Sequence, residues 1–549
     1  MPKRKTQKGV ETTPQASPQA GGLSSSADKF SPQLLKLSKK QKDKLCDRLI
    51  MNPNVHIAAE VLTELGFRND EGALTYINGH IVWEVSEQDI SQTWNYIFES
   101  KSDQEANPFF RSSASLHNAK SLKYLAKTDP ETDGKPFWHH AHCFLFPFQN
   151  GVLKISQGKV PELVPYAEME MLVEASSILP HVLILNEETL KEEYWMQSDF
   201  AELIQNQARD PKTHQVDNDL LLAIRMGLAK SCHLHFNSSD PCAVIFSEQA
   251  EQGMRNAGGT GKGILVEAIT QMVGNRARID GKSFDPAYAH ALQAITAKTR
   301  LVWVDEVDDT EQVLNAFYTG LTEGFVINPK NKKPLIIPKE RSPRVVFTTN
   351  SPGSGINDSD LRRRFDVPLT RWYHQGRQPI DDFDRELFGP EWNDDDWNRF
   401  HLCMAYACLE FLNRNYGFRR MKRCQKAQEL LIRVAENEID PDLQDHFQSS
   451  YGDSMAAKDT LEIISCWDLD KFRKAYPHNR SGVDCTRSYN NNLRKWLALK
   501  GWRLFEARHR VWRDGIQYQA LDAAPELRPE PTYQATIQDL VPNDDDKTA

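Results

Sequence analysis

The chain has 549 residues, of which 40% are hydrophobic and 26% are charged, and its formal net charge is -9 with a pI near 6.0. This length predicts about three or four domains, and no apolar run reaches the roughly 18 residues that a membrane span requires. The acidic balance argues against nucleic-acid binding over the whole surface, so any DNA contact must come from local basic patches. Nine cysteines without a CxxC pair favour free thiols in a reducing compartment, and therefore a cytoplasmic protein.

From about residue 34 to residue 124 the sequence shows no catalytic spacing. Residues 1–30 begin with PKRK and continue with Ser, Gln, Gly and Pro, which predicts a disordered tail; PKRK is also compatible with a nuclear-import patch, although a solvated charge run is commoner. Residues 31–124 are mostly helical in periodicity, with strand-like pieces ALTYI and HIVWEV, and we predict a helical adaptor. Residues 125–241 form a predicted mixed domain, in which FLFPFQNGVLKI indicates a hairpin that turns at Asn150 and Gly151.

Strands and helices alternate over residues 242–392, which predicts an α/β core built on a parallel sheet. An apolar strand over 243–246 leads to NAGGTGKGILVEAI, where glycines allow N–H groups to turn toward a phosphate. A helix that begins at Lys262 would direct its positive end to the same anion. We therefore predict a P-loop for ATP, with Lys262 reaching the β and γ phosphates. The nucleotide-binding residues are Gly258, Gly259, Thr260, Gly261, Lys262 and Gly263.

The match to G-x-x-x-x-G-K-[ST] is imperfect. Asn256 occupies the first Gly position, and Gly263 occupies the Ser/Thr position that normally contacts Mg²⁺. On this stretch alone, a Gly-rich turn with a chance lysine remains an alternative.

Polar residues follow two further predicted strands. LVWVDE ends in Asp305 and Glu306, and carboxylates at the carboxyl end of a parallel strand lie at the mouth of the sheet. We predict that Asp305 holds the Mg²⁺ shell and that Glu306 is the general base for the attacking water. The strand RVVFTTN ends at Asn350, which could orient that water.

Arg362, Arg363 and Arg364 crowd the segment DLRRRF. Three consecutive arginines cannot all face one site of their own subunit, so at least one is expected to point toward the nucleotide of a neighbour, as an arginine finger in trans. A solvated basic helix is the alternative.

The order GGTGKG, VWVDE, a lysine-rich hairpin, VVFTTN and DLRRRF resembles the superfamily 3 helicases of viruses and mobile elements, within the AAA+ ATPases. FLFPFQNGVLKI looks like the domain that precedes the motor in poxvirus-type and phage primase-helicases. The resemblance covers about residues 130–370. It implies a homo-oligomeric ring, such as a hexamer, that encloses single-stranded DNA during replication of a phage or mobile element. No primase motif is visible in the first 240 residues, so priming would need a separate protein.

Two basic patches are candidates for DNA contact. In the family resembled, a hairpin carries basic residues into the ring channel, and the matching stretch here has Lys330, Lys332 and Lys333 around the Asn331 turn. Six Lys or Arg residues lie between positions 330 and 344 against one acid, a density suited to phosphate contacts, although a solvated loop is the alternative.

The carboxy-terminal third is expected to hold a helical region at 393–465, a winged-helix-like domain at 466–521 and an acidic disordered tail at 522–549. In the winged-helix-like domain, SYNNNLRKWLALKG is a predicted helix that is followed by two strands. Its residues Leu493, Trp496 and Leu497 are expected in the core of the domain. Its wing would touch duplex phosphates through Arg508, Arg510 and Arg513, unless the module binds protein instead. The tail could serve as a partner-binding peptide, though a solubilising end is commoner.

Two histidine-rich stretches, WHHAHC and CHLH, lack the paired spacing of a zinc site and are expected to be structural. The chain is thus predicted to be an ATP-dependent DNA helicase. The alternatives are a replication initiator that remodels DNA without processive unwinding, and a nucleotide-gated scaffold without hydrolysis, which Gly263 makes conceivable.

Overall fold

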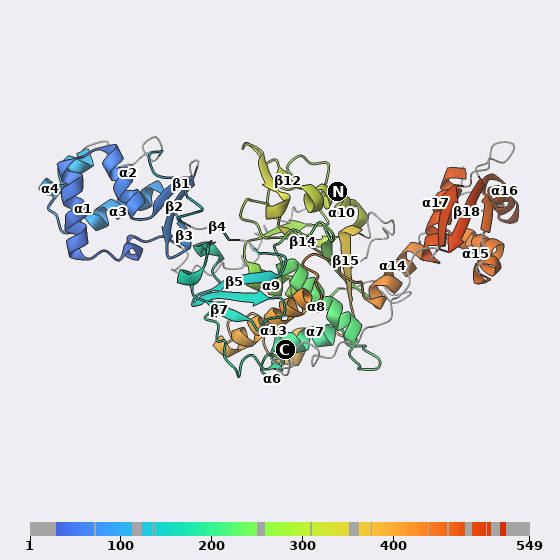
Figure 1. The fold of residues 1–549 in the computed structure, drawn as a ribbon. Coiled ribbons are helices and arrows are strands. Elements are labelled where there is room, and N and C mark those ends of the chain that lie inside the picture. The colour runs from blue at the N-terminus through green and yellow to red at the C-terminus, as the bar shows by residue number, and fades with distance from the viewer. Residues whose placement is uncertain are drawn as a thin grey trace, which may run out of the picture. The chain divides into compact units, whose positions relative to one another are not determined.

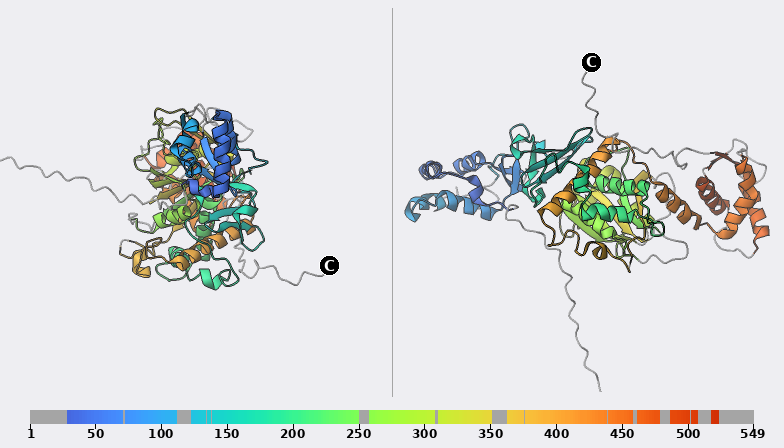
Figure 2. Two further views of the ribbon diagram at one scale, coloured as in Figure 1. Left: turned by 90° about the vertical axis from the view of Figure 1, so that its left-hand side faces the viewer. Right: turned by 90° about the horizontal axis from the view of Figure 1, so that it is seen from below.

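The computed structural model is mixed α/β, and Figures 1 and 2 show its ribbon from three sides. It describes residues 29–70, 73–111, 123–133, 135–137, 139–249, 258–307, 310–350, 362–374, 376–437, 439–457, 461–477, 486–500, 502–506 and 517–522. The chain divides into two compact units, Met1–Pro136 with Met169–Pro180, and Phe137–Glu168 with His181–Ala549. The two predicted tails lie almost wholly outside the described residues.

The first unit contains a five-stranded sheet of order β1-β2-β3-β8-β4 beside its helices. Residues 31–124 contain the helices together with the strand-like pieces ALTYI and HIVWEV, which supply β2 and β3. Capping boxes at Ser38 and Ser86 begin α1 and α3, because each side chain satisfies an N–H that the first turn leaves unpaired. The elements are η1 (Pro32–Leu35), α1 (Lys39–Met51), α2 (Val55–Glu64), β1 (Phe67–Asp70), β2 (Ala73–Asn78), β3 (Ile81–Glu84), α3 (Glu87–Ile97), α4 (Asp103–Arg111), β4 (Lys135–Pro136), β8 (Met171–Glu174) and η4 (Ala175–Ser177).

The first unit extends beyond the predicted boundary at residue 125. Strands β4 and β8 come from the stretch predicted as a separate mixed domain, yet β8 pairs with β3 in parallel and completes the first unit's sheet. The rest of that stretch belongs to the second unit. A sheet partner so distant along the chain cannot be found from local periodicity.

The second unit begins with the predicted hairpin. Strands β5 (Cys143–Phe148) and β6 (Gly151–Ser156) are antiparallel, and Phe148 pairs with Gly151, so the turn is at Gln149 and Asn150, one residue earlier than predicted. Strand β7 (Glu162–Val164) extends this sheet and is followed by η3 (Tyr166–Glu168). Helix α13 (Asp394–Asn413) packs on α6 (Glu192–Trp195), α7 (Asp199–Gln207) and, most extensively, on α8 (Asn218–Cys232).

A five-stranded sheet of order β10-β11-β14-β9-β15 lies at the centre of the second unit. All four pairings are parallel, which confirms the predicted parallel α/β core. All six residues of β9 are buried, as expected for a strand covered on both faces. Helix α8 contacts β9, β14, β15 and α9. The elements are β9 (Ala243–Glu248), α9 (Lys262–Val273), β10 (Arg276–Asp280), β11 (Leu301–Val307), α10 (Thr310–Glu323), β14 (Arg344–Thr349) and β15 (Arg364–Leu369).

Between α10 and β14 the chain forms the predicted lysine-rich hairpin. Its strands, β12 (Gly324–Ile327) and β13 (Leu335–Pro338), pair with each other, and η5 (Lys339–Arg341) leads into β14. Helix α12 (Pro379–Phe383) follows the sheet, and α14 (Gln425–Asn437) follows α13.

The carboxy-terminal part has a small core of its own. It contains α15 (Pro441–Ala456), β16 (Leu461–Ile464), α16 (Ser465–Ala475), α17 (Thr486–Leu499), β17 (Trp502–Glu506) and β18 (Gln517–Asp522), with the three strands in an antiparallel sheet. Leu493, Trp496 and Leu497 are buried in it as predicted. Because Leu443 and Phe447 of α15 belong to the same core, this part begins before residue 466. Arg508, Arg510 and Arg513 lie outside the described residues.

Candidate functional site

The loop between β9 and α9 turns through three glycines with left-handed backbone. Gly258, Gly259 and Gly261 have φ values of 75°, 86° and 80°, which glycine adopts without a steric penalty. Gly261 is the N-cap of α9, which begins at Lys262. The N-terminus of α9 therefore faces the same loop, an arrangement that suits an anion.

Gln207, at the end of α7, buttresses this loop. Its Nε2 donates to the carbonyl oxygen of Thr260 at 3.0 Å. A Cβ on Gly261 would lie 2.8 Å from that Nε2, so a side chain at position 261 would displace the buried amide. Gln207 also accepts the N–H of Thr370 through its backbone carbonyl, which ties the loop to the end of β15. Gln207 lies in none of the sequence motifs, and no local pattern indicated its role.

Lys262 and Asn350, 88 residues apart in the chain, meet at the carboxyl edge of the sheet. The Nζ of Lys262 donates to the Asn350 Oδ1 at 2.7 Å and to the Thr260 Oγ1 at 3.3 Å. Burial lowers the pKa of Lys262, and the carboxylates of Glu248, Asp305 and Glu306 oppose that shift. Four predicted site residues, Lys262, Asp305, Glu306 and Asn350, are thus brought to one edge.

Asp305 and Glu306 lie where the pairing of β11 with β14 becomes irregular. The register shifts between Val304 and Val307, and Glu306 has a φ of 52°. Non-glycine residues rarely adopt this conformation, and its occurrence at a bulge is typical of a site that re-aims a side chain. The irregularity is therefore consistent with a functional role for this pair.

Three residues absent from the sequence predictions hold the two carboxylates. Thr348 donates its hydroxyl to Asp305 Oδ1 at 2.6 Å. Arg278, on β10, lies 2.7 Å from Asp305 Oδ2, and Lys282, just after β10, lies 2.6 Å from Glu306 Oε2. Parallel neighbours bring the ends of β10, β11 and β14 together. Of the three, only Thr348 belongs to a motif, the strand that ends in TTN.

Glu248, the last residue of β9, is a further acid that lies in no motif. It is 0% exposed. Its Oε1 lies 2.9 Å from the Nε of Arg371, and its Oε2 accepts the N–H of Gly258 at 3.2 Å. A buried charge persists only when paired, and the strand end at Leu369, which pairs with Glu248, brings Arg371 close enough to pair with it.

The three consecutive arginines occupy different environments. Arg362 is exposed, whereas the guanidinium of Arg363 lies over the ring of Tyr318 with its carbon 4.5 Å from the ring centroid. Arg364 is the first residue of β15; its side chain is 0% exposed and pairs with Asp366 at 2.6 Å. The expectation that Arg364 could reach a neighbouring subunit is therefore wrong, because its guanidinium is enclosed by its own sheet.

The hairpin places its three candidate lysines at the tip. Lys330, Lys332 and Lys333 are all exposed, and Asn331 has the φ of 60° expected at a tight turn. Arg344, which the sequence places in the same basic stretch, instead starts β14 and donates to the carbonyls of His233 and His235. It is therefore not available for DNA at the tip.

The two histidine-rich stretches meet in an aromatic cluster. Nε2 of His139 contacts the carbonyl of Leu145 at 2.9 Å, and its Nδ1 accepts the N–H of Leu234 at 3.1 Å. Burial lowers the pKa of His139 to about 3. The ring of His233 lies 6.0 Å from that of His139, and its Nε2 contacts the carbonyl of His140. Both rings thus have structural contacts.

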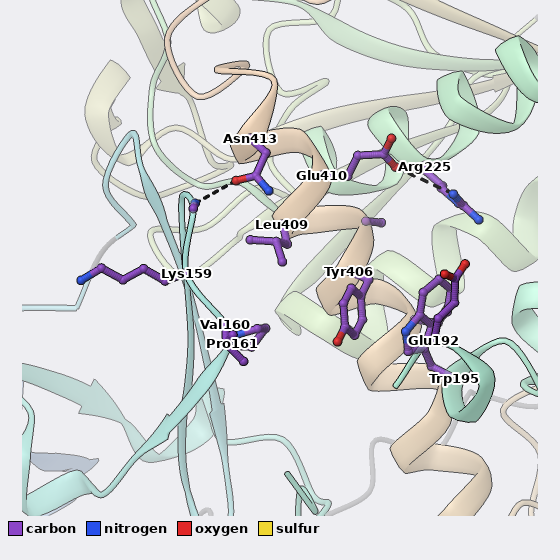
Figure 3. Close-up of a pocket in the computed structure, with 13 residues that line it drawn as sticks. Lys159, Val160, Pro161, Glu192, Trp195, Arg225, Tyr406, Leu409, Glu410 and Asn413 are labelled. Atoms are coloured by element: carbon purple, nitrogen blue, oxygen red, sulfur yellow. Dashed lines mark hydrogen bonds and ion pairs between the residues drawn. The ribbon is translucent and has the colours of Figure 1, made fainter. Parts of the chain in front are cut away.

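A pocket of about 230 Å³ lies between the turn after β6, α6 and α13 (Figure 3). Trp195 and Tyr406 stack in its wall, and Val160, Pro161 and Leu409 add apolar surface. Among the described residues, none predicted to bind nucleotide or DNA lines it. The edge of the parallel sheet, where the charged groups converge, is therefore the better candidate for chemistry.

No protein-family model and no curated protein matches this chain. Among solved structures it is similar to the apo A form of the NrS-1 C-terminal region, with 13% identity and a TM-score of 0.35, covering 85% of this chain and 99% of that one. It is also similar to the JCV helicase, with 9% identity and a TM-score of 0.21, covering 48% of this chain and 72% of that one. Because both TM-scores are low, neither likeness is by itself evidence for fold or activity.

Nowhere in the described ranges does a helix combine the length and low polarity that a bilayer crossing demands.

Proposed function

We propose that this chain is an ATP-dependent DNA helicase of the superfamily 3 type that works as a homo-oligomeric ring. The observation that carries the proposal is the contact between Lys262 and Asn350 at 2.7 Å, beside the carboxylates of Asp305 and Glu306. A lysine after a glycine loop, a carboxylate pair and a neutral amide at one sheet edge are the groups that phosphoryl transfer to water requires.

Each group has a defined task in this proposal. The loop N–H groups and Lys262 bind the phosphates, as the left-handed glycines permit. Glu306 accepts the proton of the attacking water, and Asn350 orients that water. The Glu306 side chain is 58% exposed, so its carboxylate can turn from Lys282 toward the water.

The residues present fit a magnesium ion. Mg²⁺ prefers carboxylate oxygens and keeps several water ligands, and Asp305 supplies the carboxylate. A Cβ on Gly263 would meet nothing within 4 Å, so the space of the missing Ser or Thr hydroxyl is open to water. When bound with ATP, the ion offsets the charge on the phosphates.

Two substitutions test the mechanism. Lys262→Ala should abolish nucleotide binding, whereas Glu306→Gln should retain binding and lower the hydrolysis rate by about 10² to 10⁴, because only the base is removed. Glu340→Gln, an exposed acid on η5, is the matched control and should hydrolyse ATP at the wild-type rate. Equal ATPase rates in the wild type and Glu306→Gln would refute the assignment.

Gly263 also favours a second candidate, a nucleotide-gated scaffold that does not hydrolyse ATP. A scaffold of this kind requires wild-type protein that binds ATP without turnover. A DNA-remodelling initiator would instead hydrolyse ATP without displacing a strand from a forked duplex. Measuring ATP binding, hydrolysis and strand displacement on one preparation separates the three.

A further inference from the structure

Glu248 places a carboxylate within the loop that the proposed function assigns to phosphate. Its Oε2 accepts the N–H of Gly258, a glycine of that loop. In a P-loop such N–H groups are the donors offered to a phosphate. In this structure the donor is taken by an acid of the same chain.

A buried carboxylate at a phosphate site opposes anion binding, because two negative charges repel strongly where water is excluded. Two cations lie close to it. Arg371 pairs with Glu248 Oε1 at 2.9 Å. The second cation is Lys262. Burial lowers the pKa of Lys262, and the carboxylate of Glu248 is the largest of the charges that raise that pKa.

Arg371 differs from Glu248 in its access to the solvent. The carboxylate side chain is 0% exposed, but that of Arg371 is 22% exposed, and it follows β15 by two residues. A planar guanidinium binds carboxylate and phosphate with the same donor geometry. Arg371 can therefore pair either with the buried carboxylate of Glu248 or with a phosphate.

We propose that Glu248 is an internal competitor of the nucleotide phosphates, and that Arg371 is a phosphate-binding residue supplied in cis. When a nucleotide binds, its phosphate takes the Gly258 N–H and the Arg371 guanidinium from Glu248. Glu248 thereby sets the affinity of the loop and favours nucleotide release. This inference rests on the proposed nucleotide site and specifies how that site is regulated.

Equilibrium binding of a fluorescent ATP analogue to the full chain tests the proposal. Glu248→Gln keeps the side-chain shape and removes the charge, and should bind the analogue about tenfold more tightly. Arg371→Met should bind it about tenfold more weakly, and should still weaken binding in the Glu248→Gln background, because the guanidinium it removes binds phosphate. Glu410→Gln changes an acid that is paired with Arg414 and Arg225, residues outside the loop, and should leave the affinity unchanged.

Weaker or unchanged binding by Glu248→Gln would show that the carboxylate merely braces the loop, and would overturn the competitor role. An Arg371→Met effect that vanishes in the Glu248→Gln background would show that Arg371 only neutralises Glu248. If Glu248→Gln fails to fold, Glu248→Asp, which withdraws the carboxylate by one methylene, should still tighten binding. Loss of binding in Lys262→Ala with unchanged affinity in the Glu248 variants overturns this inference alone, whereas wild-type protein that binds no nucleotide overturns the proposed function as well.

Discussion

The carboxyl edge of the parallel sheet and the tip of the β12 to β13 hairpin both carry charge, but they hold it differently. At the edge, Glu248, Asp305 and Glu306 each pair with a basic side chain within 3 Å. At the tip, Lys330, Lys332 and Lys333 are exposed to the solvent. Paired charges suit chemistry in which groups must be preorganised, whereas exposed lysines suit a partner that arrives, moves and leaves.

The largest expected effect separates these two regions. Charge reversal of all three tip lysines, each to Glu, should abolish displacement of a DNA strand while leaving the basal ATPase rate nearly unchanged, because the hairpin binds DNA phosphates and the sheet edge performs the chemistry. Strand displacement and ATPase rates, with and without single-stranded DNA, are the measurements. Unimpaired displacement would remove the motor interpretation and leave the initiator as the better account.

Reversal at Arg508, Arg510 and Arg513, the arginines of the predicted wing, provides the matched control, since it changes the same amount of charge as the tip variant. This variant should mainly weaken duplex binding, and the slope of log affinity against log salt should fall by about one unit for each phosphate that the wing no longer binds. Loss of strand displacement at unchanged duplex affinity would show that the wing, and not the hairpin, drives the strand.

The arginines after β14 test whether the sheet edge is complete within one subunit. Mixing an Arg363→Ala subunit with a Lys262→Ala subunit should restore part of the ATPase rate, since one supplies an intact P-loop and the other an intact arginine. The same mixture with Arg362→Ala identifies which of the two is the finger. If neither mixture recovers activity, the shared site is refuted.

Arg364→Ala should behave differently and lower the free energy of unfolding by about 3 to 5 kcal/mol, because it leaves Asp366 charged and buried.

Much of the candidate site could be predicted because its motifs are local. The glycine loop and Asn350 each follow an apolar strand, and Asp305 and Glu306 lie near the end of another. Parallel strands bring such ends together. The partners could not be predicted in the same way. Arg278 and Lys282 lie in no motif, and the pairing of Glu248 with Arg371 depends on β15 lying beside β9, which no local pattern specifies.

The fold was predictable to a similar extent. Alternating strands and helices indicate the parallel sheet, but the extent of the first unit's sheet was not predicted, because that sheet takes β8 from residues beyond the β5 to β6 hairpin. Periodicity detects which residues form a strand and not which strand becomes its neighbour. Arg344 illustrates the same limit. It is close to the hairpin in sequence, but its guanidinium donates to two backbone carbonyls and does not join the exposed lysines at the tip.

The smallest expected effect concerns the protonation of His139, which belongs neither to the sheet edge nor to the hairpin tip. His139 accepts the N–H of Leu234 at Nδ1, so that nitrogen bears no proton, and Nε2 donates to the carbonyl of Leu145. Burial lowers its pKa to about 3 from an ordinary value of 6.5. Between these values the unfolded chain binds the proton and the folded chain does not, so stability is present above pH 6.5 and is lost as the pH falls, by about 2 kcal/mol at pH 5.

His139→Gln should be less stable at pH 7 but lose less stability on acidification, whereas His140→Gln, whose side chain is exposed, should follow the wild type. The thermal unfolding midpoint measured from pH 7 to pH 5 decides between them. Because His233 and His401 are also buried and have lowered pKa values, some acid sensitivity should remain in His139→Gln. If the unfolding midpoint of His139→Gln falls with pH as steeply as that of the wild type, the His139 ring is not held neutral by the fold.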